Sequence, residues 1–439
     1  MLYVACLRLG AVFVPINPAG TAHEFAHVLQ DAEPRLAVVS PAEHESLRAC
    51  LAQAGLARTE TLGAHGDGSL AQLAARCAPP AFQAVHATQD AAAIVYTSGT
   101  TGHPKGAVLT RGNLASNATV LAQEWRFSGE DLLLHVLPLF HVHGLFVAIN
   151  TVLAAGAGLV LMPKFEGAAA LAELPGATVF MGVPTHYTRL LQEPGLDPHS
   201  SASVRLFVSG SAPLLAETLR EFRARTGHTI LERYGMTETL MNTSNPYAGP
   251  RVAGSVGPPL PGISVRVRGR DSGTPAAPDV IGMLEVHGPN VFAGYWRDPD
   301  KTRAEFTADG WFRTGDLGRI DAAGYVWIVG RVKDLVISGG YNVYPKEVEA
   351  ELDALDGVAE SAVFGVPHAD FGEAVTAAVV LKPGSALTEA ELIEAVRGRL
   401  SGYKVPKRVL LLAELPRNTM GKVRKDALRT TYAELYRAG

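Results

Sequence analysis

The chain of 439 residues is too long for one ordinary hydrophobic core, so two or more domains are expected. Its formal net charge of -4 argues against nucleic-acid or membrane-surface binding, which usually needs a basic patch. Cys6, Cys50 and Cys77 are too scattered for a disulfide framework or a zinc pattern, which suits a reducing, cytoplasmic setting.

The first two thirds of the chain alternate short apolar runs with helical patterns. Residues 1–18 predict a buried helix running into a strand rather than a signal peptide, because Arg8 interrupts the apolar run and no basic region precedes it. Alternating strands and helices predict an α/β fold of parallel sheets with helices on both faces. The predicted strands are Leu36–Val39, Ala92–Tyr96, Leu159–Met162, Thr178–Met181 and Leu206–Val208.

The pattern changes twice further along. From about Ser255 to Val329, tightly alternating strands with turns rich in Gly, Pro and Asp predict a smaller, more antiparallel β region. A second, α+β domain is expected from near Arg331, so we divide the chain into 1–331 and 332–439. Within it the predicted helices are Val343–Leu355 and Thr388–Leu400, and the predicted strands are Ala359–Gly365 and Val375–Leu381.

The strongest local motif is YTSGTTGHPKG, Tyr96–Gly106, directly after an apolar run. Glycines let a backbone approach an anion closely, while hydroxyl and N–H groups surround phosphate oxygens and Lys105 adds a charge. It is not a Walker loop, because Pro104 occupies the position of the second glycine. The alternative is a surface turn rich in Ser, Thr and Gly.

Two further motifs combine glycine with a carboxylate. In ERYGMTE, Glu232–Glu238, the aromatic ring can stack on a purine and Glu238 can hold Mg²⁺, although a solvated helix start is also open. In GWFRTGD, Gly310–Asp316, we expect Asp316 in a turn, where it can accept two ribose hydroxyls or make an ordinary Asx turn.

The last two motifs lie at the expected domain boundary and near the C-terminus. Residues 330–346, GRVKDLVISGGYNVYPK, place two glycines beside charged residues, as a hinge or an ordinary connection would. In RNTMGK, Arg417–Lys422, the lysine follows a glycine and precedes a basic helix, where a solvated surface lysine is the alternative.

Together these five motifs resemble, in order and spacing, the core motifs of the adenylate-forming superfamily of acyl-CoA synthetases, luciferases and peptide-synthetase adenylation domains. The resemblance covers nearly the whole chain. It implies a large N-terminal domain of parallel sheets flanked by helices, a small β subdomain and a small mobile α+β C-terminal domain. It also implies an enzyme that uses ATP and Mg²⁺ to join an acid to coenzyme A through an acyl-adenylate.

The same resemblance implies roles for individual residues. The β- and γ-phosphates would be held by Lys105 and by Thr97, Ser98, Gly99, Thr100, Thr101 and Gly102. The ribose would be held by Asp316 and Arg331, and the adenine framed by Gly210, Ser211, Ala212 and Tyr234, with Gly235 beside them. The implied catalytic residues are Lys422, Lys105, His141, Thr237 at the α-phosphate and Glu238 on Mg²⁺.

A rotation of the small domain is also implied. The hinge would be Lys333. Lys422 would serve adenylation and then leave the site as the domain rotates. Gly339, Gly340 and Tyr341 would take its place and line the thiol tunnel. In some relatives the lysine matching Lys422 is acetylated, which implies a possible acetyltransferase as a partner.

Several stretches are most similar to malonyl-CoA and methylmalonyl-CoA synthetases, among them HVHGLFVA, GVPTHYTRLL and LPRNTMGKV. A dicarboxylate in a closed pocket needs a cation, because an unpaired buried charge costs several kcal/mol. Arg189, four residues after Thr185 on a predicted helix, is the first candidate and Arg251 the second. His141 and His143 follow the run LHVLPLF near the expected acid site, where a packed core histidine is the alternative.

Three interpretations of the function stay open at this point. The first is malonate or methylmalonate, which differ by one methyl group. The second is another short acid or a carrier protein, and the third is an inactive, truncated nucleotide-binding homologue. Relatives carry a further stretch before the position of Met1, so we expect either a misplaced start or a truncation that exposes apolar surface.

Overall fold

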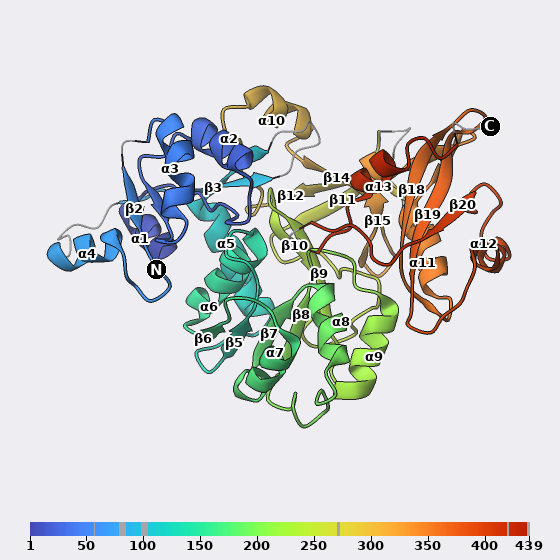
Figure 1. The fold of residues 1–439 in the computed structure, drawn as a ribbon, viewed down its shortest axis with the longest axis horizontal. Helices are drawn as coiled ribbons and strands as arrows, with labels where there is room; N and C mark the ends of the chain where they lie inside the picture. Colours follow the sequence, from blue (N-terminus) through green and yellow to red (C-terminus); the bar gives the residue numbers. More distant parts are fainter. Residues whose placement is uncertain (57, 79–84, 98–103, 270–272, 419–420, 437–439) are drawn as a thin grey trace.

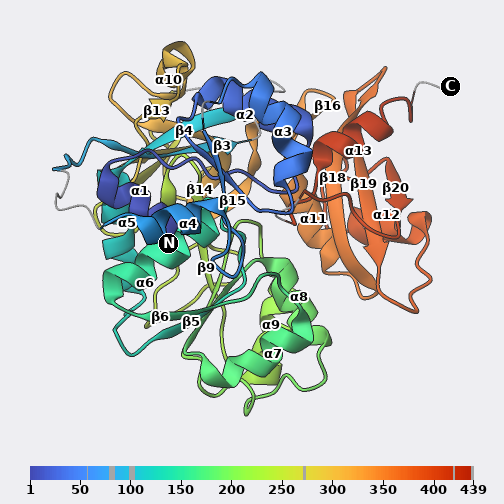
Figure 2. The same ribbon diagram turned by 60° about the vertical axis from the view of Figure 1, so that its left-hand side comes forward.

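The computed structural model of the chain describes residues 1–56, 58–78, 85–97, 104–269, 273–418 and 421–436. The first three quarters of the chain form a large body, and the C-terminal quarter forms a smaller one beside it (Figures 1 and 2). Across these described ranges, no helix is both long and apolar enough to cross a lipid bilayer.

A six-stranded sheet forms the middle of the large body, in the order β10-β9-β8-β7-β5-β6. All neighbours pair in parallel except β10, which is antiparallel to β9. The strands are β5 (Leu132–His135), β6 (Gly158–Leu161), β7 (Val179–Gly182), β8 (Leu206–Ser209), β9 (Leu231–Met236) and β10 (Leu240–Ser244). The prediction of a parallel sheet is confirmed for three of the predicted strands, which correspond to β6, β7 and β8.

Helices cover both faces of this sheet because its strands are apolar on both sides. Leu133 packs towards one face, while Leu134, the next residue of β5, packs towards the other. The first face is covered by α5 (Arg111–Glu124) and α6 (Asn150–Ala155), which follows the π-helix η1 (His143–Ile149). The second is covered by α7 (Gly167–Glu173), extended by η2 (Leu174–Gly176), α8 (Pro184–Gln192) and α9 (Ala216–Thr226).

Two smaller sheets belong to the N-terminal part. β1 (Ala37–Val39) and β2 (Thr59–Thr61) pair in parallel. β3 (Ala91–Thr97) is wrongly predicted as a parallel strand, because it forms an antiparallel sheet with β4 (Lys105–Thr110) and β13 (Gly294–Tyr295). The connection between β3 and β4 is shorter than the crossover of about a dozen residues that a parallel pair needs. The helices here are α1 (Leu2–Leu9), α2 (Ala22–Ala32), α3 (His44–Gln53), α4 (Ser69–Arg76) and α10 (Pro299–Glu305).

The predicted antiparallel region is confirmed as a four-stranded sheet in the order β11-β12-β14-β15. Its strands are β11 (Ser264–Arg268), β12 (Gly282–His287), β14 (Phe312–Ile320) and β15 (Val326–Arg331). The prediction of a turn at Asp316 is wrong, because this residue lies within β14 opposite Arg331 of β15. Gly315, with φ +72°, lies where the pairing of β12 with β14 changes register, so the strand is irregular here without ending in a turn.

The small body is an α+β unit, as predicted, that follows η3 (Val332–Asp334). Its sheet contains β16 (Val336–Ser338), β17 (Tyr341–Val343), β18 (Val358–His368), β19 (Gly372–Leu381) and β20 (Arg408–Leu411). Helices α11 (Pro345–Asp353) and α12 (Glu389–Arg397) pack on one face and α13 (Lys425–Thr431) on the other.

Two local signals explain the helix boundaries of the small body. The helix predicted from Val343 begins only at Pro345, because Val343 pairs with Val336 in the sheet and proline favours the first helical turn. The predicted start at Thr388 is confirmed as an N-cap, where Thr388 and Glu391 form a reciprocal capping box.

Candidate active site

The carboxyl ends of β5, β7, β8 and β9 meet at one edge of the central sheet, where ligands bind in open α/β folds. This edge brings together residues that are far apart in the sequence. They include His141 and His143 after β5, Thr185 after β7, Gly210, Ser211 and Ala212 after β8, Tyr234 and Gly235 in β9, and Thr237 and Glu238 directly after β9.

A buried carboxylate lies where the central sheet meets the four-stranded sheet. Asp316 is only 3% exposed. Its Oδ2 accepts a hydrogen bond from the Tyr234 hydroxyl at 2.5 Å. Its Oδ1 lies 3.0 Å from Nε of Arg331, whose side chain is half-exposed. Burial and the Asp316 charge raise the pKa of Tyr234 well above its usual range, so the phenol stays a hydrogen-bond donor. The arrangement fixes the orientation of both Asp316 oxygens.

A second buried carboxylate belongs to Glu238, which is 7% exposed and accepts a hydrogen bond from the Tyr295 hydroxyl at 3.0 Å. Burial raises the pKa of Glu238, so a nearby cation would stabilise its charged form. Oxygen donors of this kind fit Mg²⁺. Lys105 Nζ lies 5.8 Å from the centre of the Tyr295 ring, and Thr97 ends the neighbouring strand. The predicted phosphate-loop residues Ser98, Gly99, Thr100, Thr101 and Gly102 lie outside the described residues.

The small body contributes Lys422 to this cluster. Lys422 lies on a loop closed by its own backbone, because Asn418 N–H donates to the Lys422 carbonyl at 2.9 Å and Lys422 N–H donates to Asn418 Oδ1 at 3.0 Å. Burial and the charge of Arg331 lower the pKa of Lys422 to about 8, while Asp316 and Glu238 oppose this shift. The loop therefore brings the Lys422 amine within electrostatic reach of Asp316 and Glu238.

Arg233, in β9, is the residue that motif reasoning missed. It is 3% exposed, and two of its donors, Nε and Nη2, are buried without a hydrogen-bond partner among the described residues. Burial lowers its pKa to about 9, so the guanidinium remains charged at neutral pH. A buried arginine without a partner is rare, and an arginine directly after the apolar run of a central strand was the available signal.

Unpaired polar atoms of neighbouring residues accompany Arg233. His143 is fully buried; its Nδ1 hydrogen-bonds with Ser211 Oγ at 3.2 Å, and its Nε2 has no partner among the described residues. Ser209 Oγ is likewise unpartnered within the described part of the chain. Burial and the charge of Arg233 lower the pKa of His143, and burial lowers that of His141 to about 3, so both imidazoles are neutral. Buried polar atoms normally have hydrogen-bond partners, so this group is a candidate ligand-binding site.

The two predicted substrate arginines lie elsewhere. Arg189 is exposed and lines a pocket of about 290 Å³ at the boundary between the two bodies. That pocket is lined by Leu137, Pro138, Val183, Thr185, His186 and Arg189 of the large body and by Arg417, Asn418 and Gly421 of the small one. Arg251 is not brought to the site: its guanidinium donates to the carbonyls of Pro246, Tyr247 and Thr229, at the amino end of β9.

The residues predicted for the thiol step are on the small body. Gly339 (φ +58°) and Gly340 (φ +82°) form the turn between β16 and β17. Tyr341 is 60% exposed and stacks on Tyr403, with ring centres 4.8 Å apart. Lys333 lies in η3, the short connection between β15 and β16. All four are exposed rather than part of the buried cluster.

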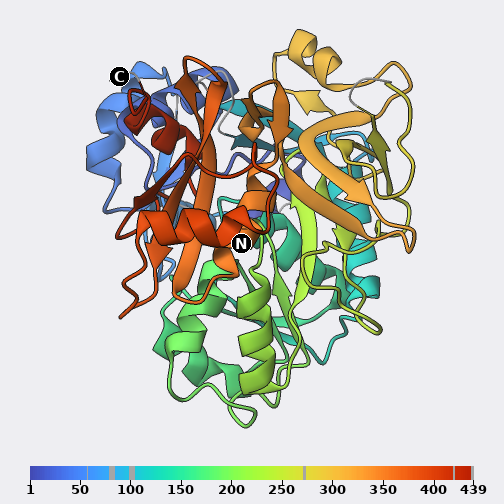
Figure 3. The same ribbon diagram turned by 90° about the vertical axis from the view of Figure 1, so that its right-hand side faces the viewer.

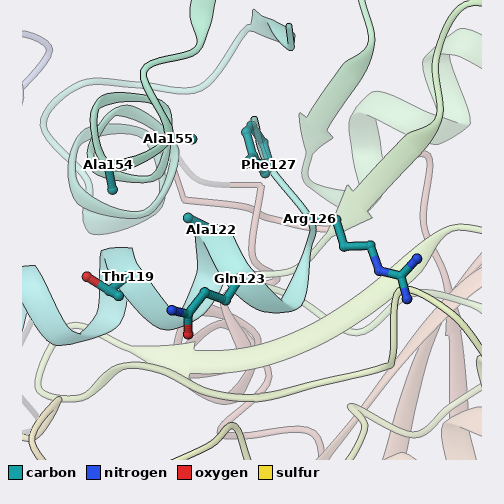
Figure 4. A pocket seen from close by; sticks show the side chains of 7 residues that line it. All are labelled: Thr119, Ala122, Gln123, Arg126, Phe127, Ala154 and Ala155. Atoms are coloured by element: carbon teal, nitrogen blue, oxygen red, sulfur yellow. The ribbon is translucent and has the colours of Figure 1, made fainter. Parts of the chain in front are cut away.

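A larger hollow of about 460 Å³ lies between α5 and α6 (Figure 4). Its lining is mainly small and apolar, with Arg126 as the one charged residue among those that line it. The Arg126 guanidinium lies over the Tyr247 ring, 5.1 Å from its centre. The hollow contains none of the carboxylates or histidines gathered at the sheet edge, so the chemistry belongs to that edge.

The sequence comparisons agree with this geometry. The AMP-binding enzyme family matches residues 1–296, and the AMP-binding enzyme C-terminal domain matches residues 347–422. The chain belongs to the AMP-binding enzyme family.

Its relatives within the family include the mitochondrial malonate–CoA ligase of Mus musculus, 43% identical over 79% of this chain and 65% of that protein. The chain thus spans about two thirds of the length of this relative. The sulfoacetate–CoA ligase of Cupriavidus necator is 38% identical over 97% of this chain and 83% of its own length.

The solved structures place the fold within the same family. ATP-bound MatB from Rhodopseudomonas palustris is 54% identical and superposes with a TM-score of 0.96, covering 99% of this chain and 86% of that one. Apo MatB from the same organism, with the same identity and coverage, has a TM-score of 0.84. Because the sequences are equally similar, the difference lies in conformation. This AMP-binding enzyme therefore has the arrangement seen in the ATP-bound relative.

Proposed function

We propose that this enzyme is an ATP-dependent malonate–CoA ligase, with domains at 1–331 and 332–439 that hinge at Lys333. One malonate carboxylate oxygen attacks the α-phosphorus of ATP, the bond from that phosphorus to the bridging oxygen breaks, and pyrophosphate leaves. The coenzyme A sulfur then attacks the carbonyl carbon of malonyl-adenylate, and AMP leaves with the bonding electron pair. The thiol proton goes to solvent.

The observation that carries the malonate assignment is Arg233, a buried charge whose Nε and Nη2 have no hydrogen-bond partner in the described part of the chain. A planar guanidinium fits a carboxylate in a bidentate manner, and a buried pair of opposite charges removes the cost of an unpaired one. The second carboxylate of malonate would supply the missing partner. His143 Nε2 and Ser209 Oγ offer further hydrogen bonds beside it. We place the acid here rather than at the exposed Arg189.

The remaining residues act on the nucleotide. Attack of one anion on another needs positive charge positioned in advance, which Lys422 and Lys105 supply. Glu238 would hold Mg²⁺, whose charge neutralises the triphosphate. Thr237 would contact the α-phosphate, and Asp316 with Arg331 would hold the ribose hydroxyls. Tyr234 and residues 210–212 would frame the adenine, and Gly339, Gly340 and Tyr341 would serve the thiol after rotation.

An acid panel tests the proposal. ATP–pyrophosphate exchange is measured with malonate, methylmalonate, sulfoacetate and acetate, followed by thioester formation with coenzyme A. We expect the highest kcat/KM with a malonate-class dianion and negligible exchange with acetate. Malonate and methylmalonate differ by one methyl group, worth only ~1–3 kcal/mol. Sulfoacetate, also a dianion, is the second candidate, because a guanidinium binds sulfonate as well. Preference for a monoanion would overturn the assignment, and absence of exchange with every acid would favour an inactive homologue.

Gly210 offers a direct test of the acid site. A Cβ atom at Gly210 would lie 2.4 Å from Cζ and Nη1 of Arg233, so Gly210→Ala should displace the guanidinium. Overpacking of this kind costs ~1–3 kcal/mol, and we expect the malonate KM to rise about 10- to 100-fold with the ATP KM little changed. Gly398→Ala is the matched control, because its Cβ meets nothing within 4 Å. A rise in the ATP KM alone would mean that Gly210 serves only the adenine and has no role in the acid site.

Two further expectations stay predictions. Acetylation of Lys422 by an acetyltransferase would block adenylation, because it removes the amine charge. A cytoplasmic location is our proposal for this chain, whereas the Mus musculus relative is mitochondrial.

A further inference from the structure

An ion pair between Glu217 and Lys382 joins the two bodies. Lys382, directly after β19, places its Nζ 2.7 Å from Glu217 Oε1 in the first turn of α9. The side chains are 36% and 43% exposed. Figure 3 shows α9 beside the lower end of the small body, where this contact forms. The pair therefore depends on how the two bodies are oriented.

A second carboxyl group of the large body lies near the start of α9. Glu232 is 4% exposed; its Oε1 accepts a hydrogen bond from Leu214 N–H at 3.2 Å, and its Oε2 has no partner among the described residues. Burial raises the pKa of Glu232 to about 7, while the charge of Lys346 on α11 opposes this rise. Because Leu214 lies just before α9, Glu232 and Glu217 place two carboxyl groups near one end of this helix.

The ion pair matters because delivery of Lys422 is electrostatically unfavourable in part. The charges of Arg331 and Arg233 both lower the pKa of Lys422, which means that they repel its ammonium form. Asp316 and Glu238 attract it, so an attractive pair at the boundary adds to their effect. Glu217–Lys382 is such a pair, and neither residue is among those proposed for the chemistry.

We propose that the Glu217–Lys382 pair positions the small body for adenylation and separates when the small body leaves that orientation. The inference rests on the proposed function. The two structures of the Rhodopseudomonas palustris relative differ in their likeness to this chain, with TM-scores of 0.96 and 0.84, so more than one arrangement exists in the family. Glu217 and Lys382 are positioning residues, because they act through the placement of Lys422.

Charge reversal tests the exposed pair. An exposed ion pair changes an equilibrium by up to about fivefold, so Lys382→Glu and Glu217→Lys should each lower ATP–pyrophosphate exchange by about fivefold. Single-turnover transfer from enzyme-bound adenylate to coenzyme A should not slow. The double variant, which restores the pair with reversed polarity, should recover exchange to within about twofold. The effect of the single variants should shrink at 1 M salt, where charges are screened.

Glu389→Gln is the matched control, because Glu389 pairs at 2.8 Å with Arg408 within the small body and has similar exposure. It should change neither step. Equal losses in both half-reactions, or a double variant as slow as the single ones, would overturn the positioning role. A wild-type enzyme without exchange for any acid would instead reject the proposed function.

Discussion

Replacing Lys422 with alanine should lower the rate of adenylate formation by ~10²- to 10³-fold, the scale for losing one preorganised electrostatic donor. The amine lies among Asp316, Glu238 and Arg331, where two anionic reactants would meet. ATP–pyrophosphate exchange measures this step. Transfer of a preformed acyl-adenylate to coenzyme A should keep its wild-type rate, because Lys422 has no role in it. Lys407→Ala, an exposed lysine of the small domain, is the control.

The pH dependence of the same step has a defined sign. Burial and Arg331 lower the pKa of Lys422 to about 8, so the charged amine is the main form below pH 8 and is lost as the pH rises through that value. The kcat/KM for ATP, which reports on the free enzyme, should therefore be level below pH 8 and fall about tenfold per pH unit well above it. Lys422→Ala should remove this decline. A decline that persists in the variant would assign the titration to another group.

Replacing Arg233 with methionine should lower kcat/KM for malonate by about 10²- to 10³-fold, because a buried carboxylate would lose its partner. The ATP KM should change little. Arg233→Lys should fall between the two, since an ammonium keeps the charge but not the bidentate geometry. Arg189→Ala, at an exposed arginine, should change kcat/KM by less than about fivefold.

A stability measurement separates this role from a structural one. Arg233 is buried, and two of its donors have no partner within the residues that the structure describes, so methionine at this position should leave Tm unchanged or raise it. A loss of malonate use together with a large drop in Tm would mean that Arg233 supports the fold. If Arg189→Ala abolished malonate use while Arg233→Met preserved it, the acid would bind in the pocket at the domain boundary.

The elements predicted correctly from the sequence are those with a local signal. Apolar runs followed by glycine, proline or serine predicted β6, β7 and β8, and the Thr388 capping box marked the start of α12. Prediction failed where one local sequence pattern is compatible with two structures. The segment after β3 allowed a hairpin as readily as a crossover, and the residues before Pro345 paired in a sheet instead of joining the helix. Asp316 follows a glycine, as turn residues do, yet cross-strand pairing keeps it in β14.

The candidate site shows the same division. Glycine-rich motifs directed attention to Lys105, Glu238, Asp316 and Lys422, but Arg233 was passed over inside one of those motifs because its burial is invisible in the sequence. Arg251 was proposed because it is a cation near the right segment. Its three carbonyl partners could not be foreseen, since they depend on how the loop after β10 folds back on the amino end of β9.

By itself, the sequence determined the family, the order of the elements and the motifs that carry ionisable groups, because these depend on residue type and spacing along the chain. Only the tertiary structure decided which charges meet. Packing buried Arg233 and left its Nε and Nη2 without hydrogen-bond partners among the described residues. The docking of the small body brought Lys422 within electrostatic reach of Asp316 and placed Lys382 against Glu217. These effects arise from burial and from distances between residues up to about two hundred positions apart, which no local pattern encodes.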